Sequence, residues 1–183
     1  MPTASAAVGV AILGDHAFVV DPVSGLRIVD ISTPSSPIEV GSIDEPLWSA
    51  SHVAAADGHA YCAAGGDGLR IVDVSTPSSP LEVAVFLPIL GASDVAVADG
   101  FAYLIDDAGV LQVIDVSIPS SPADAGVIDT PGNGHQVEVV GNRVYLANEG
   151  MGLGLFRGCA ESILADGFES GDTSAWSLTI PAP

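Results

Sequence analysis

The sequence predicts an all-β fold of tandem antiparallel sheets, and three observations support this prediction. A block at 25–37, GLRIVDISTPSSP, returns 43 residues later at 68–80 with twelve of its thirteen positions unchanged. A third copy, VLQVIDVSIPSSP, follows 42 residues after that at 110–122, and a degraded fourth includes Leu153. Short β-prone runs fill the intervals, and Gly, Asp, Asn and Pro turn residues separate them. A period of 42 to 43 residues is the length of one four-stranded blade of a β-propeller.

Each period divides into four strands, and the first is joined to the second by a two-residue turn such as Asp57-Gly58. Predicted first strands are 8–13, 53–56, 95–98 and 137–140, and predicted second strands are 16–20, 59–63, 101–105 and 143–147. The third strands are the Leu-x-Ile-Val-Asp blocks, and the fourth strands are 38–43, 81–86 and 123–128. We therefore expect a propeller of four-stranded antiparallel blades, an incomplete or four-blade fragment with repeats at about 6–44, 50–87, 93–129 and 135–158. The last repeat is degenerate, and a polar tail at 159–183 lies outside the repeats.

The repeated block also resembles a known family. The Leu-x-Ile-Val-Asp run, the preceding hairpins at 57–61 and 99–103, and the following Ser-x-Pro-Ser-Ser-Pro resemble the LVIVD-repeat family over about residues 6–158. The resemblance implies a β-propeller of secreted or cell-surface bacterial proteins, without a catalytic activity common to the family. It also implies more blades than four, so we expect the chain to be part of a longer protein.

Charge and hydropathy exclude several classes of partner. Asp and Glu number 23 against four Arg and no Lys, which gives a formal net charge of −19. Binding to nucleic acid needs clustered Lys and Arg, so a nucleic-acid partner is not expected. No apolar run approaches the ~20 residues that cross a bilayer, so insertion of this chain into a membrane is not expected either. No signal peptide is visible after Met1, so an extracellular or cell-surface location is expected from the resemblance alone.

The two cysteines, Cys62 and Cys159, are too few and too far apart for a disulfide framework or a zinc knuckle. Cys62 lies in a predicted second strand where the other repeats have Val19, Leu104 and Leu146. We therefore expect Cys62 to be a small buried hydrophobic residue.

Strand alternation places the segments that differ between repeats on one side of the blades, which we call the top face. These segments are 21–24, 44–51, 65–67, 87–93, 106–108, 129–135 and 148–150. They are rich in acids, and calcium binding is one hypothesis for Asp21, Asp67, Asp106 and Asp107. Because no Asp-x-Asp-x-Asp-Gly loop is present, the favoured interpretation is solvated acids that keep the protein soluble.

Asp30, Asp73 and Asp115 occur once per repeat, at the end of each third strand and directly before a turn. A carboxylate at such a position accepts hydrogen bonds from the backbone amides that follow it. We expect these residues to have a structural role in the repeat.

A second set of candidates lies where the first strands begin. His52, Asp94 and Gln136 are equivalent positions near the top mouth of a central channel, and His135 adjoins Gln136. Such a ring could bind a transition metal or polarise a water, but more often it is a set of satisfied polar groups. Trp48, in a top connection, is either an anchor for a partner or a plug on the neighbouring blade.

No nucleophile, metalloprotease or phosphate-binding motif occurs in the sequence. The leading hypothesis is a non-catalytic extracellular binding or scaffold module whose top face meets a protein, glycan or cation. One alternative is a hydrolase or lyase-like enzyme using His52, Asp94 and His135 at the channel mouth, which requires these three side chains to converge. The other alternative is a structural spacer without a ligand.

Overall fold

The computed structural model describes residues 6–44, 50–87, 91–106, 108–130, 132–149 and 152–157 of the chain. These segments form strands β1 to β15 and one short 3-10 turn, η1 (Gly65–Asp67), with no α-helix among them. None of these segments contains a helix that could span a bilayer. The all-β prediction is therefore confirmed.

The strands form sheets whose order follows the sequence, with every neighbouring pair antiparallel. Blade 1 consists of β1 (Gly9–Leu13), β2 (His16–Asp21), β3 (Gly25–Asp30) and β4 (Ile38–Ile43). Blade 2 consists of β5 (His52–Ala56), β6 (His59–Ala63), β7 (Leu69–Asp73) and β8 (Leu81–Phe86). Blade 3 consists of β9 (Asp94–Ala98), β10 (Phe101–Ile105), β11 (Val110–Asp115) and β12 (Ala123–Asp129). Blade 4 has three strands in the described part of the chain, β13 (Asn133–Val140), β14 (Arg143–Glu149) and β15 (Gly152–Arg157).

Tight turns join the first and second strands of the blades. In blades 2 and 3 both turn residues have positive φ, 48° and 73° at Asp57 and Gly58, and 52° and 78° at Asp99 and Gly100. Two successive positive φ angles define the hairpin turn whose twist matches the flanking strands. In blade 1 the glycine comes first in the turn, and Gly14 has a φ of 58°. Both arrangements keep the inner strand in register with its partner.

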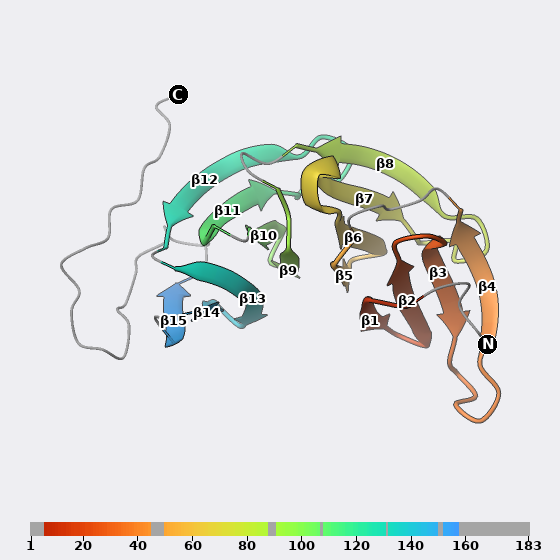
Figure 1. Ribbon diagram of the computed structural model, residues 1–183. Helices are drawn as coiled ribbons and strands as arrows, with labels where there is room; N and C mark the ends of the chain where they lie inside the picture. Colours follow the sequence, from red (N-terminus) through yellow and green to blue (C-terminus); the bar gives the residue numbers. More distant parts are fainter. Residues whose placement is uncertain are drawn as a thin grey trace.

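The blades are arranged around an axis. The first strands β1, β5, β9 and β13 are the inner strands, and β1 contacts β5, β5 contacts β9, and β9 contacts β13. Figure 1 shows the four blades as an arc that is open on one side, with blade 1 at one end and blade 4 at the other. This radial arrangement is that of a β-propeller.

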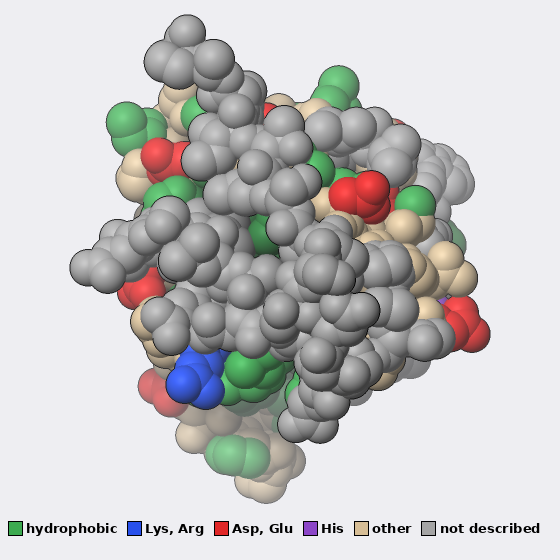
Figure 2. Space-filling model, turned by 90° about the vertical axis from the view of Figure 1, so that its left-hand side faces the viewer, with side chains coloured by type: hydrophobic (Ala, Val, Ile, Leu, Met, Phe, Trp, Pro, Cys, Tyr) green, Lys and Arg blue, Asp and Glu red, His purple; other side chains and the backbone are tan. Residues whose placement is uncertain are grey.

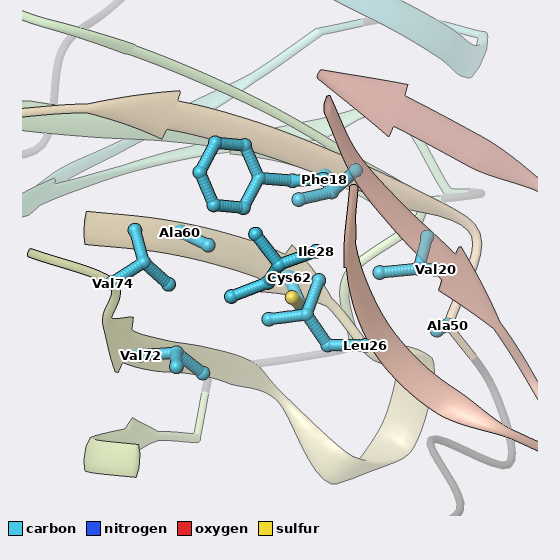
Figure 3. Close-up of a cluster of buried hydrophobic side chains, with 10 residues drawn as sticks. Phe18, Val20, Leu26, Ile28, Ala50, Ala60, Cys62, Val72 and Val74 are labelled. Carbon is cyan, nitrogen blue, oxygen red and sulfur yellow. The ribbon is translucent and has the colours of Figure 1, made fainter. Parts of the chain in front are cut away.

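Apolar side chains fill the space between neighbouring blades. Between blades 1 and 2, Phe18 and Ile28 pack with Cys62 and Val72 in one buried cluster (Figure 3). Two further clusters of the same kind lie between blades 2 and 3 and between blades 3 and 4. Each blade is one sheet thick, so its apolar side chains are removed from water by the adjacent blades.

Candidate functional site

The top face is formed by the loops between second and third strands and by the connections that lead into the next blade. Backbone hydrogen bonds hold these connections against the ends of the second strands. The Ser51 amide donates to the Ala63 carbonyl (3.0 Å), and the Ser93 amide donates to the Ile105 carbonyl (2.8 Å). Segments from different blades therefore lie side by side on this face.

A pocket of about 340 Å³ opens on the top face between blades 2 and 3. Two reciprocal backbone hydrogen bonds form part of its wall, from the Gly65 amide to the Ala92 carbonyl (2.9 Å) and from the Ala92 amide to the Gly65 carbonyl (3.1 Å). The described lining residues are small except for one acid, and they are Gly65, Gly66, Gly91, Ala92, Ser93, Asp106 and Ala108. Among these residues, small side chains leave the volume open beside one carboxylate.

Asp106 is the charged group among the described lining residues, and it is 5% exposed. Its Oδ1 accepts hydrogen bonds from the amides of Ala108 (2.9 Å) and Val110 (2.8 Å) and so shapes the loop between β10 and β11. Its Oδ2 is buried and has no hydrogen-bond partner among the described residues. Buried carboxylate oxygens are normally satisfied, so this oxygen is an unused acceptor within a residue that lines the pocket.

Asp21 holds the equivalent place in blade 1. It is buried, and its Oδ1 accepts hydrogen bonds from the amides of Val23 (2.8 Å) and Ser24 (3.1 Å). Blade 4 has Asn148 at this position, and the Asn148 Nδ2 donates to the Thr130 Oγ1 (3.1 Å). The position therefore organises top-face loops in three of the blades.

The residues of the calcium hypothesis are distributed over separate loops. Asp21 lies in blade 1, Asp106 in blade 3, and Asp67 is exposed in η1 of blade 2. Asp107 lies outside the described residues. Within the described ranges, no group of three or more His, Cys, Asp and Glu side chains could hold a metal ion.

A second hollow, of about 260 Å³, lies among the inner strands of all four blades. His52 and Gln136, which are equivalent positions of the repeat, are among its lining residues. The His52 Nδ1 lies 3.2 Å from the Asp94 Oδ1. His52 and Asp94 therefore contact each other, and Gln136 lines the same hollow as His52.

Asp94 joins three blades. It is buried in blade 3, where its Oδ1 accepts from the Val95 amide (2.8 Å), and its Oδ2 accepts from the Val137 amide of blade 4 (2.8 Å). His52 belongs to blade 2. Burial raises the pKa of Asp94, while the hydrogen bond from Val137 and the neighbouring His52 act in the opposite direction. With both oxygens engaged by backbone amides, this carboxylate acts as a structural junction.

His135 has a different neighbour. Its Nε2 lies 3.4 Å from the Glu149 Oε2, which also accepts a hydrogen bond from the Asn133 Nδ2 (3.2 Å). The bonds from Asn133 and His135 lower the pKa of Glu149. His135 is exposed and is not among the residues that line the inner hollow. Trp48, the other ligand-binding candidate, lies outside the described residues.

The acids at the ends of the third strands bind the turns that follow them. Oδ1 of each accepts from the amide two residues later, Asp30 from Ser32 (2.8 Å), Asp73 from Ser75 (2.9 Å) and Asp115 from Ser117 (2.9 Å). Hydrogen bonds from the side chain and the amide of that serine lower the pKa of each carboxyl group. The same local structure is thus repeated in three blades.

The sequence matches a known repeat. A family model for the LVIVD repeat matches residues 4–45, 49–87 and 91–130, which contain the three blades with four strands. The chain belongs to the LVIVD repeat family. No curated protein matches this LVIVD-repeat chain significantly.

Solved structures share the fold of the LVIVD-repeat chain at low sequence identity. A functionally unknown protein from Desulfotomaculum acetoxidans DSM 771 is 14% identical with a TM-score of 0.77, over 90% of this chain and 56% of that one. Apo AztD from Citrobacter koseri is 16% identical with a TM-score of 0.61, over 87% of this chain and 46% of that one. The computationally designed Ika4 protein is 10% identical with a TM-score of 0.66, over 86% of this chain and 94% of that one. The LVIVD-repeat chain therefore spans about half of the two natural proteins, and the likeness shows the fold alone.

Asp106 was not distinguishable from the other top-face acids by its local sequence. The signal that was available is the repeat itself, since Asp21, Asp106 and Asn148 recur at one position of the 42- to 43-residue period. The pocket could not be found in this way, because Gly65, Gly91 and Asp106 come from three segments that only the fold brings together.

Proposed function

We propose that this LVIVD-repeat chain is a non-catalytic binding or scaffold module, and that its ligand enters the top-face pocket between blades 2 and 3. The observation that supports the proposal is the Asp106 Oδ2, a buried carboxylate oxygen beside a pocket of about 340 Å³ and without a partner in the described part of the chain. A buried acceptor without a hydrogen bond is unfavourable in free energy, and a bound group that donates a hydrogen bond to this oxygen would remove that penalty. An extracellular or cell-surface location belongs to the same proposal.

The favoured ligand is a positively charged side chain, Lys or Arg, of a protein partner. The chain has a formal net charge of −19, so a cationic partner is attracted before contact. An ammonium or guanidinium group also donates hydrogen bonds, which a carboxylate accepts strongly. A calcium ion or a glycan hydroxyl would meet the same oxygen, and these ligands are distinguished in the experiment below.

The enzyme alternative is less well supported. Its three residues do not form one cluster, because His135 lies against Glu149 while His52 lies against Asp94. The Asp94 carboxylate accepts two amide hydrogen bonds, so it already has a structural role that limits its use as a base.

Calorimetric titration tests the proposal with three probes: a short Arg- and Lys-containing peptide, calcium chloride, and a set of neutral oligosaccharides. We expect the basic peptide to bind and Asp106→Asn to weaken its binding at least about tenfold, since a hydrogen bond to a charged group contributes about 1.5–3 kcal/mol. Asparagine keeps an acceptor for the amides of Ala108 and Val110, so the loop should be preserved. Asp67→Asn, in an exposed acid of the same face, is the matched control and should bind as the wild type does.

Two results would contradict the proposal. The first is no heat with any of the three probes. The second is equal peptide affinity for wild type and Asp106→Asn, with circular dichroism showing both proteins folded. If calcium or an oligosaccharide binds to the wild type but not to Asp106→Asn, the pocket remains the proposed site. That probe then replaces the basic side chain as the proposed ligand.

A further inference from the structure

Every interface between neighbouring blades is formed by two apolar faces. We call the face turned towards the next blade in sequence the trailing face, and the face turned towards the preceding blade the leading face. Between blades 1 and 2 the trailing face contributes Phe18, Val20, Leu26 and Ile28, and the leading face contributes Val53, Ala60, Cys62, Val72 and Val74. Equivalent residues, 42 to 43 positions later each time, form the next two interfaces.

The leading face of blade 1 has no neighbouring blade in the described part of the chain. Val10 is 60% exposed, whereas its equivalents Val53, Val95 and Val137 are 3%, 3% and 2% exposed. Ile12 on the same strand is also exposed, at 57%. Each of the three buried valines packs against the preceding blade. Val10 is exposed because blade 1 has no preceding blade in the described part of the chain.

The trailing face of blade 4 likewise has no neighbouring blade among the described residues. Leu153 is 48% exposed, whereas its equivalents Leu26, Leu69 and Leu111 are 1%, 0% and 0% exposed. Figure 2 views the molecule from the left-hand side of Figure 1, and hydrophobic side chains reach the surface in several small patches of this view. The two end faces therefore have the side chains of the two halves of a blade interface.

We propose that a second copy of this chain covers both end faces at once. The leading face of each copy packs on the trailing face of the other, and the two arcs close into one ring around a two-fold axis. Figure 1 shows the two faces at the ends of an arc, a shape in which head-to-tail contacts can close rather than extend into a filament. The internal interfaces suggest the kind of occupant, because in the described part of the chain another blade covers each face of this kind. A second copy supplies such a blade, whereas further blades of a longer chain would cover the faces within one monomer, an outcome that the test below distinguishes.

The two natural proteins of this fold are about twice as long as this chain, which covers 56% of the Desulfotomaculum acetoxidans protein and 46% of AztD. In the proposal a second copy supplies a comparable length, whereas further blades of the same polypeptide would leave the protein monomeric. The end faces are apolar, so the opposing force is the long-range repulsion between two chains of net charge −19, which salt screens within a Debye length of ~8 Å at physiological ionic strength.

The test is the molar mass in solution, measured by sedimentation and light scattering at physiological salt. We expect a dimer for the wild type and monomers for Val10→Asp and for Leu153→Asp, since each change places a charge in both interfaces of the ring. Leu81→Asp is the control, because Leu81 is 65% exposed on the outer strand of blade 2 and lies on neither end face. It should remain dimeric, and circular dichroism should show all three variants folded.

Mixing the two variants tests the head-to-tail arrangement itself. Val10→Asp keeps an intact trailing face, and Leu153→Asp keeps an intact leading face. In a mixed dimer these two faces can form one interface without a substituted residue. We expect each variant to be monomeric alone and the mixture to contain a dimer, weaker than that of the wild type. The proposal is overturned if the wild type is monomeric at every concentration, if Leu81→Asp disrupts the dimer as Val10→Asp does, or if either end-face variant alone still dimerises.

Discussion

The Asp94 carboxylate lies where blades 2, 3 and 4 meet, and its two oxygens accept hydrogen bonds from the amides of Val95 and Val137. A carboxylate can accept at both oxygens, whereas an asparagine side chain presents one acceptor and one donor. The geometry at this position therefore requires an acid and explains why a charged residue is buried there.

We expect Asp94→Asn to lower the free energy of unfolding by about 1–3 kcal/mol, because its amide group must face a buried backbone N–H. Urea unfolding followed by circular dichroism measures the change. Asp129→Asn, in an exposed acid at the end of β12, is the control and should unfold as the wild type does. Superimposable curves for wild type and Asp94→Asn would show that the junction contributes no stability.

The acids at the ends of the third strands make stability depend on pH. The pKa values of Asp30, Asp73 and Asp115 lie below the ordinary value of 3.8 in the folded chain. A carboxyl group of lowered pKa contributes stability above its unfolded value and loses it as the pH falls through the folded value. Asp94, whose pKa is raised, contributes in the opposite sense, losing stability as the pH rises through its folded value.

A triple variant, Asp30→Asn with Asp73→Asn and Asp115→Asn, isolates this effect because asparagine keeps an acceptor without the charge. We expect the triple variant to be less stable than the wild type at pH 6, and the difference to shrink as the pH falls below 3.8. Chemical unfolding at several pH values measures the two free energies. A difference that stays constant, or grows, as the pH falls would contradict the assignment.

Cys62 is fully buried between blades 1 and 2, and burial raises the pKa of its thiol to about 12. Since the thiolate is the reactive form, we expect Cys62 to be unreactive towards Ellman's reagent at neutral pH in the folded chain. The measurement is made in Cys159→Ser, which leaves Cys62 as the single thiol. Reaction should begin when urea unfolds the protein, and rapid reaction without urea would contradict the packing of this interface.

At the scale of the strands, the backbone of β4 in blade 1 lies close to the backbone of the turn after β7 in blade 2. A Cβ atom added at Gly41 in β4 would lie 1.9 Å from the Pro77 carbonyl oxygen, in the turn that follows β7. Because the obstacle is backbone, neither partner can move aside without displacing a strand or a turn. The outer strand therefore depends on glycine at this position.

We expect Gly41→Ala to lower stability by about 1–3 kcal/mol, the usual cost of overpacking. Gly66→Ala is the matched control, since a Cβ at Gly66 meets nothing within 4 Å and its φ is not positive. Thermal unfolding of both variants measures the difference. Equal midpoints would show that β4 and the turn can separate without cost.

The strands were predictable from the sequence to within one or two residues in blades 1 to 3. Their turns have strong local chemistry, as at Asp57-Gly58, and the repeat shows each boundary three times. Blade 4 has a single degenerate copy, and β13 begins at Asn133, four residues before its predicted start at Val137. The extension includes an irregularity between Gly134 and Gln136, which no local pattern signals.

The candidate site was less predictable than the strands. His52, Asp94 and Gln136 are equivalent in the repeat, and position within the repeat determines position around the axis. In the structure His52 contacts Asp94, and His52 and Gln136 line one hollow. The unpartnered oxygen of Asp106 and the pairing of His135 with Glu149 depend on side-chain contacts between segments. Such contacts are set by packing, so the sequence pattern did not reveal them.

At the scale of the whole molecule, the blades depend on one another for burial. Blades 2 and 3 have a neighbour on each face, while blades 1 and 4 have a neighbour on one face within the described chain. Stability in such an array comes largely from the interfaces between units. Blades 1 and 4 should therefore open more readily than the two central blades when the chain is monomeric.

Amide hydrogen exchange resolved by blade tests this dependence most directly, because protection reports the free energy of local opening. At a protein concentration low enough for monomers, we predict the slowest exchange in β6 and β10 and faster exchange in β2 and β14. Uniform protection of the four strands, or faster exchange in β6 and β10 than in β2 and β14, would contradict the account of blades that stabilise one another through their apolar faces.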